Sequence, residues 1–159
     1  MLVVDQSAGD RSIALGLADA SCFQRMLQAA LQDHPDCTVV VKVHPDVISG
    51  RSRGHFTAED LAHPRVRLSA DGGHPARLLE RARAVYVVTS QMGFEALLWG
   101  RPVHCFGMPV YGGWGLTQDR CEAPIRRRQG ASLEALVHAA LVGVCRCIDP
   151  HQHQACSIE

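Results

Sequence analysis

Two short polar segments stand where apolar stretches of the chain end, and both carry groups that bind anions. In KVHPD at 42–46, Lys42 and His44 are two residues apart, so both side chains point to the same face of an extended strand. A cation beside an imidazole can hold a phosphate and stabilise negative charge that develops on a leaving group. Pro45 ends the strand and fixes the turn. A solvent-exposed strand end explains the same residues equally well, so this motif by itself does not establish a phosphate site.

The second polar segment is TSQMGFEALL, which starts at Thr89 and runs into a predicted helix. A helix start offers free backbone N–H groups and the positive end of the helix dipole, which suit a phosphate. Thr89 or Ser90 taken singly is most simply an N-cap, but the pair followed by Gln91 favours an anion site. Gly93 would let the backbone approach a ligand or a strand, and Glu95 could favour the dipole or reach a ribose hydroxyl.

Two carboxylates flank a glycine in DQSAGDRS at 5–12, at the mouth of the first apolar stretch. A carboxylate at such a place often caps a following turn, and a cap accounts for either residue. The functional interpretation is a nucleophile or an acid–base group at a cleft. Asp10 is the first candidate and Asp5 the second.

A loop rich in glycine and aromatic residues follows the last apolar stretch, in FGMPVYGGWGLTQDR at 106–120. Aromatic residues make up only 5% of the chain, yet Tyr111 and Trp114 both lie here, interleaved with the three glycines at 112, 113 and 115. This composition favours a flexible binding loop over a surface loop pinned by two rings.

Short strands alternating with helices must position these groups. Apolar runs predict strands in MLVV at 1–4, CTVVVKV at 37–43, RVRLS at 65–69, AVYVVTS at 84–90 and PVHCFG at 102–107. Helical patterns occupy 18–33, 75–83, 93–100, where Gly100 closes the helix, and 132–148, where Ser132 caps it. Continuous apolar strands indicate an α/β fold, a Rossmann-like parallel sheet with helices on both faces. Ligands bind at the carboxyl ends of such strands, where the polar segments lie.

Length, charge and cysteine usage narrow the class of protein. The chain has 159 residues and 47% hydrophobic content, which suits one domain, and its 16 basic residues balance 16 acidic ones. The only basic cluster in the sequence is RRR at 126–128, so we expect no nucleic-acid partner. Seven cysteines without a CxxC favour a reduced, cytoplasmic protein, and no run is long enough to span a membrane. Without HExxH or DxD, the sequence predicts metal-free chemistry and no cofactor.

Four segments taken in order closely resemble the capsule polysaccharide biosynthesis proteins of the KpsC type, which are retaining β-Kdo transferases. They are VVDQSAGDRSI, VVVKVHPDV, VYVVTSQMGFEALLWGRPVHCFGMPVYGGWGLT and IDP. The resemblance implies the C-terminal, donor-binding domain of a GT-B glycosyltransferase over 1–148, followed by a polar tail at 149–159. It also implies CMP-Kdo as donor and a lipid-linked Kdo acceptor based on phosphatidylglycerol. The enzyme would be peripheral to the cytoplasmic face of the inner membrane.

The resemblance carries roles to individual residues. The implied donor-binding set is Lys42, His44, Pro45, Asp71, Thr89, Ser90, Gln91, Gly93 and Glu95. Within it, His44 and Pro45 match the HP motif that holds CMP, and Asp71 is the nearest match to the acidic residue that binds the cytidine ribose. The implied catalytic set is His44, which stabilises the leaving CMP, with Asp10 or Asp5 as the nucleophile.

The resemblance covers only the donor half of the family's two-domain arrangement. We therefore expect a missing N-terminal domain or partner chain, with this chain a fragment or a split subunit. Whether it is an enzyme by itself stays open. Two alternatives also stay open: a non-catalytic nucleotide-binding or interaction module, and a GT-B half that uses another nucleotide sugar.

Overall fold

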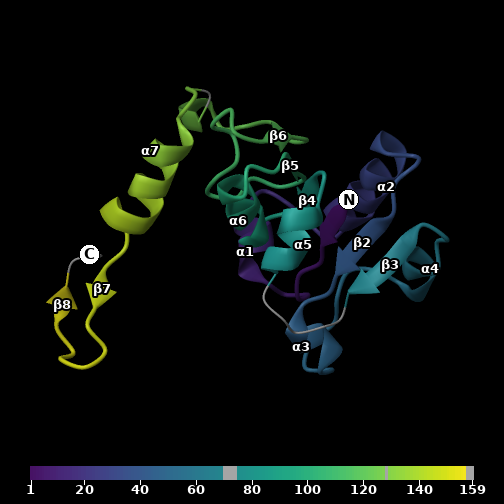
Figure 1. Ribbon diagram of the computed structural model, residues 1–159, viewed down its shortest axis with the longest axis horizontal. Helices are drawn as coiled ribbons and strands as arrows, with labels where there is room; N and C mark the ends of the chain where they lie inside the picture. Colours follow the sequence, from purple (N-terminus) through teal and green to yellow (C-terminus); the bar gives the residue numbers. More distant parts are fainter. Residues whose placement is uncertain (70–74, 128, 157–159) are drawn as a thin grey trace.

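A six-stranded sheet forms the centre of the computed structural model, which describes residues 1–69, 75–127 and 129–156 (Figure 1). The strands are β1 (Leu2–Val4), β2 (Val39–Lys42), β3 (Val66–Ser69), β4 (Val85–Val87), β5 (Val103–Cys105) and β6 (Gln118–Asp119). All their pairings are parallel, in the order β3-β2-β1-β4-β5-β6. The order reverses between β1 and β4, as in Rossmann-like sheets. The predicted fold is therefore confirmed.

One face of the sheet is covered by α2 (Ser21–Asp33), the longest helix among the described residues. Val3 and Tyr86 point to this face and share a buried core with Phe23 and Met26 of the helix. Apolar residues three and four apart on α2 form the stripe that the sequence pattern predicts. The strand residues in this core alternate along each strand with those that point to the opposite face.

The opposite face is covered by α5 (Ala76–Arg81) and α6 (Met92–Leu98). Leu2 and Val85, neighbours of Val3 and Tyr86 along the chain, belong to this second core. Gly100, with φ of +64°, ends the α6 segment in the left-handed region, as predicted. Helices on both faces are what buries continuous apolar strands.

Four short helical segments lie in the connections between the longer elements and were not predicted. They are α1 (Arg11–Leu15), α3 (Pro45–Ile48), α4 (Ala58–Leu61) and the 3₁₀ turn η1 (Ile125–Arg127). Segments of one turn carry no 3.6-residue apolar period, so the sequence pattern does not indicate them. Pro45 does end the β2 segment, but it does so as the first residue of α3, a position where proline needs no hydrogen-bond partner for its nitrogen.

The C-terminal part extends away from the sheet in Figure 1. Its helix α7 (Leu133–Val137) is capped by Ser132 as predicted, and it continues as a π-helix, η2 (His138–Gly143). The prediction of a helix to residue 148 was wrong, because the chain turns into β7 (Cys147–Ile148), which pairs with β8 (Ala155–Cys156) as a hairpin. Among the described residues, no helix combines the length and apolar character that a membrane crossing requires.

Candidate functional site

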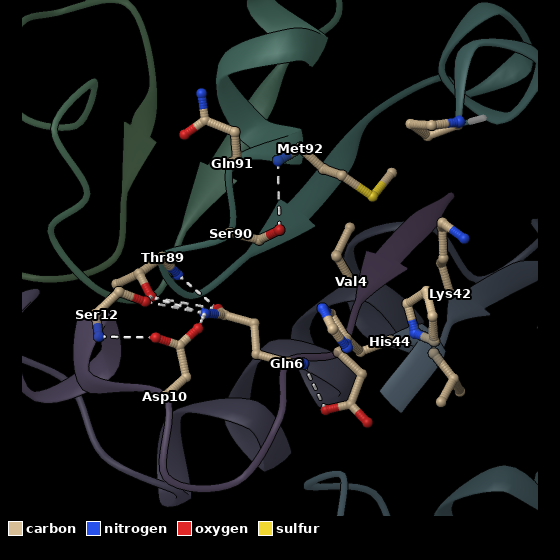
Figure 2. Close-up of a pocket in the computed structure, with 14 residues that line it drawn as sticks. Val4, Gln6, Asp10, Ser12, Lys42, His44, Thr89, Ser90, Gln91 and Met92 are labelled. Carbon is tan, nitrogen blue, oxygen red and sulfur yellow. Dashed lines mark hydrogen bonds between the residues drawn. The ribbon is translucent and has the colours of Figure 1, made fainter. Parts of the chain in front are cut away.

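A cavity of about 510 Å³ opens at the carboxyl ends of β1, β2 and β4, where the strand order reverses (Figure 2). Its volume lies in the range of roughly 300–1,000 Å³ that is typical of small-molecule sites. The cavity brings these predicted site residues together: Asp5, Asp10, Lys42, His44, Pro45, Thr89, Ser90 and Gln91. They come from three segments of the chain, and parallel pairing is what places the three strand tips at one edge.

Two predicted donor-binding residues lie away from the cavity, and a third cannot be placed. Asp71 lies outside the described residues. Gly93 and Glu95 lie on α6 and are not among the described residues that line the cavity. Gly93 instead faces the buried ring of Tyr111, with no room for a side chain between them.

His44 forms the N-cap of α3, and this cap occupies one of its two ring nitrogens. Its Nδ1 accepts a hydrogen bond from the backbone N–H of Asp46 at 3.2 Å and lies 3.3 Å from the Ser7 hydroxyl. Because Nδ1 is an acceptor, the neutral imidazole carries its proton on Nε2. His44 therefore offers an N–H donor at the mouth of the cavity, next to Lys42 on the preceding strand tip.

The elbow between β4 and α6 supplies further donors. The Ser90 Oγ accepts from the backbone N–H of Met92 at 3.3 Å, which leaves the Ser90 hydroxyl proton for another acceptor. Within the described part of the chain, the backbone N–H groups of Ser90 and Gln91 donate to no protein acceptor. Thr89 does not cap the helix; its hydroxyl lies 3.0 Å from the Ser12 hydroxyl instead.

Sequence reasoning missed Gln6, which is only 4% exposed and lines the cavity. Its side-chain amide contacts Asp10, Ser12 and Thr89 through both of its polar atoms. Ser12 was missed as well. Glutamine and serine do not stand out as functional residue types in DQSAGDRS. The only sequence signal for Gln6 and Ser12 was that each lies close to a candidate carboxylate.

Asp10 is held by hydrogen bonds on both of its carboxylate oxygens. Oδ1 accepts from the backbone N–H of Ser12 at 2.8 Å, which makes Asp10 the N-cap of α1, and Oδ2 accepts from Gln6 Nε2 at 3.0 Å. Burial disfavours its charged form, but these hydrogen bonds outweigh burial and lower its pKa. Asp10 thus stays ionised at neutral pH at the edge of the cavity.

Asp5 is also in the cavity wall, yet its surroundings differ from those of Asp10. It is 4% exposed, and its Oδ1 accepts from the backbone N–H groups of Gln6 at 2.9 Å and His55 at 3.1 Å. The His55 ring, stacked on Phe23 at 3.7 Å, places Nδ1 3.3 Å from the same oxygen. Burial raises the pKa of Asp5, against the opposing effect of these hydrogen bonds. Asp5 therefore anchors the segment around His55 to the tip of β1.

Asp5→Asn is expected to become more stable relative to the parent protein as the pH rises. The folded pKa of Asp5 lies above its ordinary value of 3.8, so ionisation opposes folding and stability is lost as pH rises through the folded pKa. Asparagine removes this loss, which is limited to about 1.4 kcal/mol per pH unit for one proton. Urea unfolding of both proteins between pH 4 and 7 measures the difference.

Asp10→Asn serves as a control, because its stability relative to the parent should change with pH in the opposite direction. Its lowered pKa means that the charged form of Asp10 stabilises the fold above the ordinary pKa of 3.8, and that this stabilisation is lost as pH falls. The Asp10 variant should therefore lose stability relative to the parent as the pH rises toward 3.8, so the unfolding of this pair is followed from about pH 2 upward. A pH-independent difference for Asp5→Asn would contradict the assignment of a raised pKa to that residue.

The loop that follows β5 is packed against the site and does not line it. Tyr111 is fully buried, and its hydroxyl donates a hydrogen bond to the carbonyl oxygen of Ser90. Trp114 Nε1 donates to the carbonyl of Val110 at 2.8 Å, and the Arg127 guanidinium lies over the Trp114 ring at 5.6 Å. This loop packs against the elbow between β4 and α6 and contributes no residue to the cavity lining. The cavity therefore does not support the interpretation as a binding loop.

The fold and the cavity define a Rossmann-like α/β protein with a polar site at the point where its strand order reverses. A sequence model of the family described as "Capsule polysaccharide biosynthesis protein" matches residues 1–148. The chain belongs to this family.

Two curated relatives are similar along most of this chain. The capsule polysaccharide modification protein LipA of Neisseria meningitidis serogroup B is 42% identical over 163 residues, covering 99% of this chain and 23% of LipA. The lipopolysaccharide-processing protein LpsZ of Rhizobium meliloti is 37% identical over 142 residues, covering 89% of this chain and 32% of LpsZ. This chain thus spans about a quarter to a third of these relatives' length.

Two solved structures of KpsC from Thermosulfurimonas dismutans share the fold. Its beta Kdo 2,4 transferase superposes with a TM-score of 0.91 at 41% identity, covering 99% of this chain and 48% of that one. Its beta Kdo 2,7 transferase gives a TM-score of 0.79 at 29% identity, covering 98% and 49%. The predicted resemblance to KpsC-type proteins is confirmed, and the chain spans about half of each solved transferase.

Proposed function

We propose that this chain is the donor-binding domain of a retaining β-Kdo glycosyltransferase that uses CMP-Kdo, and that it acts with a further domain or partner chain. One observation carries the proposal. The strand tip with Lys42 and His44 and the elbow with Ser90 line the same cavity, in a chain that superposes on KpsC transferases along almost its whole length.

The donors around the cavity suit a phosphate that gains charge as it leaves a sugar. Lys42 supplies a cation, and His44 supplies an Nε2–H, because its Nδ1 is the capping acceptor. The hydroxyl of Ser90 and the N–H groups at the elbow add neutral donors. Groups held in place before the reaction stabilise departing charge best, at roughly 3–4 kcal/mol per donor in other oxyanion sites. The proposed chemistry needs no metal ion.

Retention of configuration follows from two displacements at one carbon. In the first, the bond between the Kdo anomeric carbon and the CMP phosphate oxygen breaks, and an Asp10 oxygen forms a bond to that carbon. In the second, an acceptor hydroxyl replaces Asp10 and gives up its proton to a base. Asp10 suits the nucleophile's role better than Asp5, because its pKa is lowered, whereas Asp5 is buried and has a raised pKa.

The rest of the reaction would be supplied from outside this chain. The solved transferases are about twice as long, which supports a second domain or chain that completes the cleft. We place there the site of a Kdo acceptor linked to phosphatidylglycerol, at the cytoplasmic face of the inner membrane.

Calorimetry with CMP, UMP and UDP tests the nucleotide assignment. We expect CMP to bind at least about ten times more tightly than UMP, which differs from it only in the base. A tenfold difference in affinity corresponds to about 1.4 kcal/mol of binding free energy. Tighter binding of UDP would overturn the cytidine assignment and favour a UDP-sugar enzyme. Absence of binding by all three nucleotides would overturn the donor-domain proposal.

A further inference from the structure

The buried amide of Gln6 joins two parts of the cavity that are far apart in the sequence. Its Nε2 lies 3.0 Å from Asp10 Oδ2 and 3.0 Å from Thr89 Oγ1, and 3.3 Å from the Ser12 hydroxyl. Its Oε1 accepts from the backbone N–H of Thr89 at 3.0 Å. Figure 2 shows these contacts radiating from one side chain to the loop after β1 and to the elbow after β4.

The chemistry of these partners selects an amide. The backbone N–H of Thr89 needs an acceptor, whereas the Asp10 carboxylate needs a donor, and glutamine carries both at its tip. Glutamate in place of Gln6 would set a second negative charge against Asp10. A lysine could not accept from Thr89, and it would neutralise the carboxylate instead of only orienting it.

The two ends of this tether have different tasks in the proposed reaction. Asp10 would attack the sugar, whereas the elbow that begins at Thr89 would hold the departing phosphate. With Oδ1 bound to the Ser12 N–H and Oδ2 to Gln6, the Asp10 carboxylate is fixed by two neutral donors and keeps its charge. No other described side chain hydrogen-bonds both to Asp10 and to the backbone of the elbow.

We propose that Gln6 is a positioning residue: its side-chain amide holds the Asp10 carboxylate and the Thr89 elbow in one fixed arrangement. The role of this arrangement in catalysis rests on the proposed function. The tether itself is a property of the free chain, and it can be measured without any nucleotide.

The test compares Gln6→Leu with Gln24→Leu. Gln24 makes a similar contact outside the cavity, from its Nε2 to Asp60 Oδ2 at 2.8 Å, and the pKa of Asp60 is likewise lowered overall, despite its partial burial. In Gln6→Leu, the carboxyl titration of Asp10 measured by NMR should move to higher pH while that of Asp60 stays. In Gln24→Leu, the titration of Asp60 should move to higher pH while that of Asp10 stays unchanged.

Two further measurements report on the elbow. Amide hydrogen exchange at Thr89 should become faster in Gln6→Leu, because its N–H loses the Oε1 acceptor. Affinity for CMP should fall roughly 2- to 12-fold, the range expected for one lost hydrogen bond. Gln24→Leu should change neither quantity.

Gln6→Glu covers the case in which Gln6→Leu does not fold. It keeps an acceptor for the Thr89 N–H but places a carboxylate beside Asp10, so the Asp10 titration should move to higher pH while Thr89 exchange stays slow. A folded Gln6 variant with an unchanged Asp10 titration overturns the inference. So does unchanged CMP affinity in Gln6→Leu. If the parent protein binds no nucleotide, the proposed function fails, and the titration and exchange measurements still decide the tether.

Discussion

Replacing His44 with asparagine is expected to weaken CMP binding by roughly 10- to 100-fold, the cost of losing a hydrogen bond to a charged group. Asparagine is a good N-cap, and its side-chain oxygen can accept from the Asp46 N–H as His44 Nδ1 does. The shorter side chain does not reach where Nε2 lies. The variant therefore removes the proposed hydrogen-bond donor to the phosphate while the start of α3 is kept, and calorimetry with CMP measures the loss.

His63 provides a matched control for this substitution. Its Nδ1 accepts from the backbone N–H of Arg65 at 3.2 Å, the same distance and the same spacing of two residues as at His44, but His63 does not line the cavity. His63→Asn should leave CMP affinity within about twofold. Asp10→Asn should also retain binding, because in the proposed reaction Asp10 acts on the sugar and not on the phosphate. Similar losses in all three variants would contradict the separate roles.

Gly93→Ala is expected to destabilise the protein by about 2 kcal/mol or more, although alanine favours helices. A Cβ at position 93 would lie 2.6 Å from Cζ and 2.8 Å from Cε2 of Tyr111, and closer still to its hydroxyl oxygen. Tyr111 is 1% exposed and cannot move aside without disturbing the second core. Overpacking of this kind costs about 1–3 kcal/mol, occasionally more. For a chain of this size, we expect thermal unfolding roughly 4–8 °C lower.

Two comparisons isolate the cause of this destabilisation. Gly143 also lies in a helical segment, and a methyl group added there would have only one atom nearby, the His138 carbonyl oxygen at 3.8 Å. Gly143→Ala should therefore be neutral or stabilising by roughly 0.5–1 kcal/mol. In a Tyr111→Phe background, Gly93→Ala should cost less, because the nearest clashing atom is gone. An equal cost in both backgrounds would show that Tyr111 is not the obstacle.

The role of Gly93 illustrates what the sequence could and could not predict about the site. Its place at the start of a helix was correctly predicted, and a close approach was expected there. The approaching group is the Tyr111 ring, whose hydroxyl donates to the Ser90 carbonyl, and not a ligand. Residues 93 and 111 belong to different elements, so no local pattern could pair them.

The two carboxylates near the start of the chain make the same point through electrostatics. Asp5 and Asp10 stand in one polar segment and were candidates for one role. The fold gives them opposite pKa shifts, because Asp5 is buried beside His55, fifty residues away in the sequence, whereas Asp10 lies at the cavity edge with donors on both oxygens. Burial depends on which segments meet in space, and single-sequence reasoning has no access to it.

Local patterns in the chain were enough to predict five of the six strands of the sheet, the helices α2, α5 and α6, and the edge of the sheet where the polar residues gather. They were enough because apolar runs and 3.6-residue periods are properties of neighbouring residues, and because parallel strands end at a common edge. The contact from Gln6 to Thr89, 83 positions further along, could be found only in the folded chain. That contact exists because β1 and β4 are adjacent where the strand order reverses, and adjacency of strands is set by the packing of the whole domain.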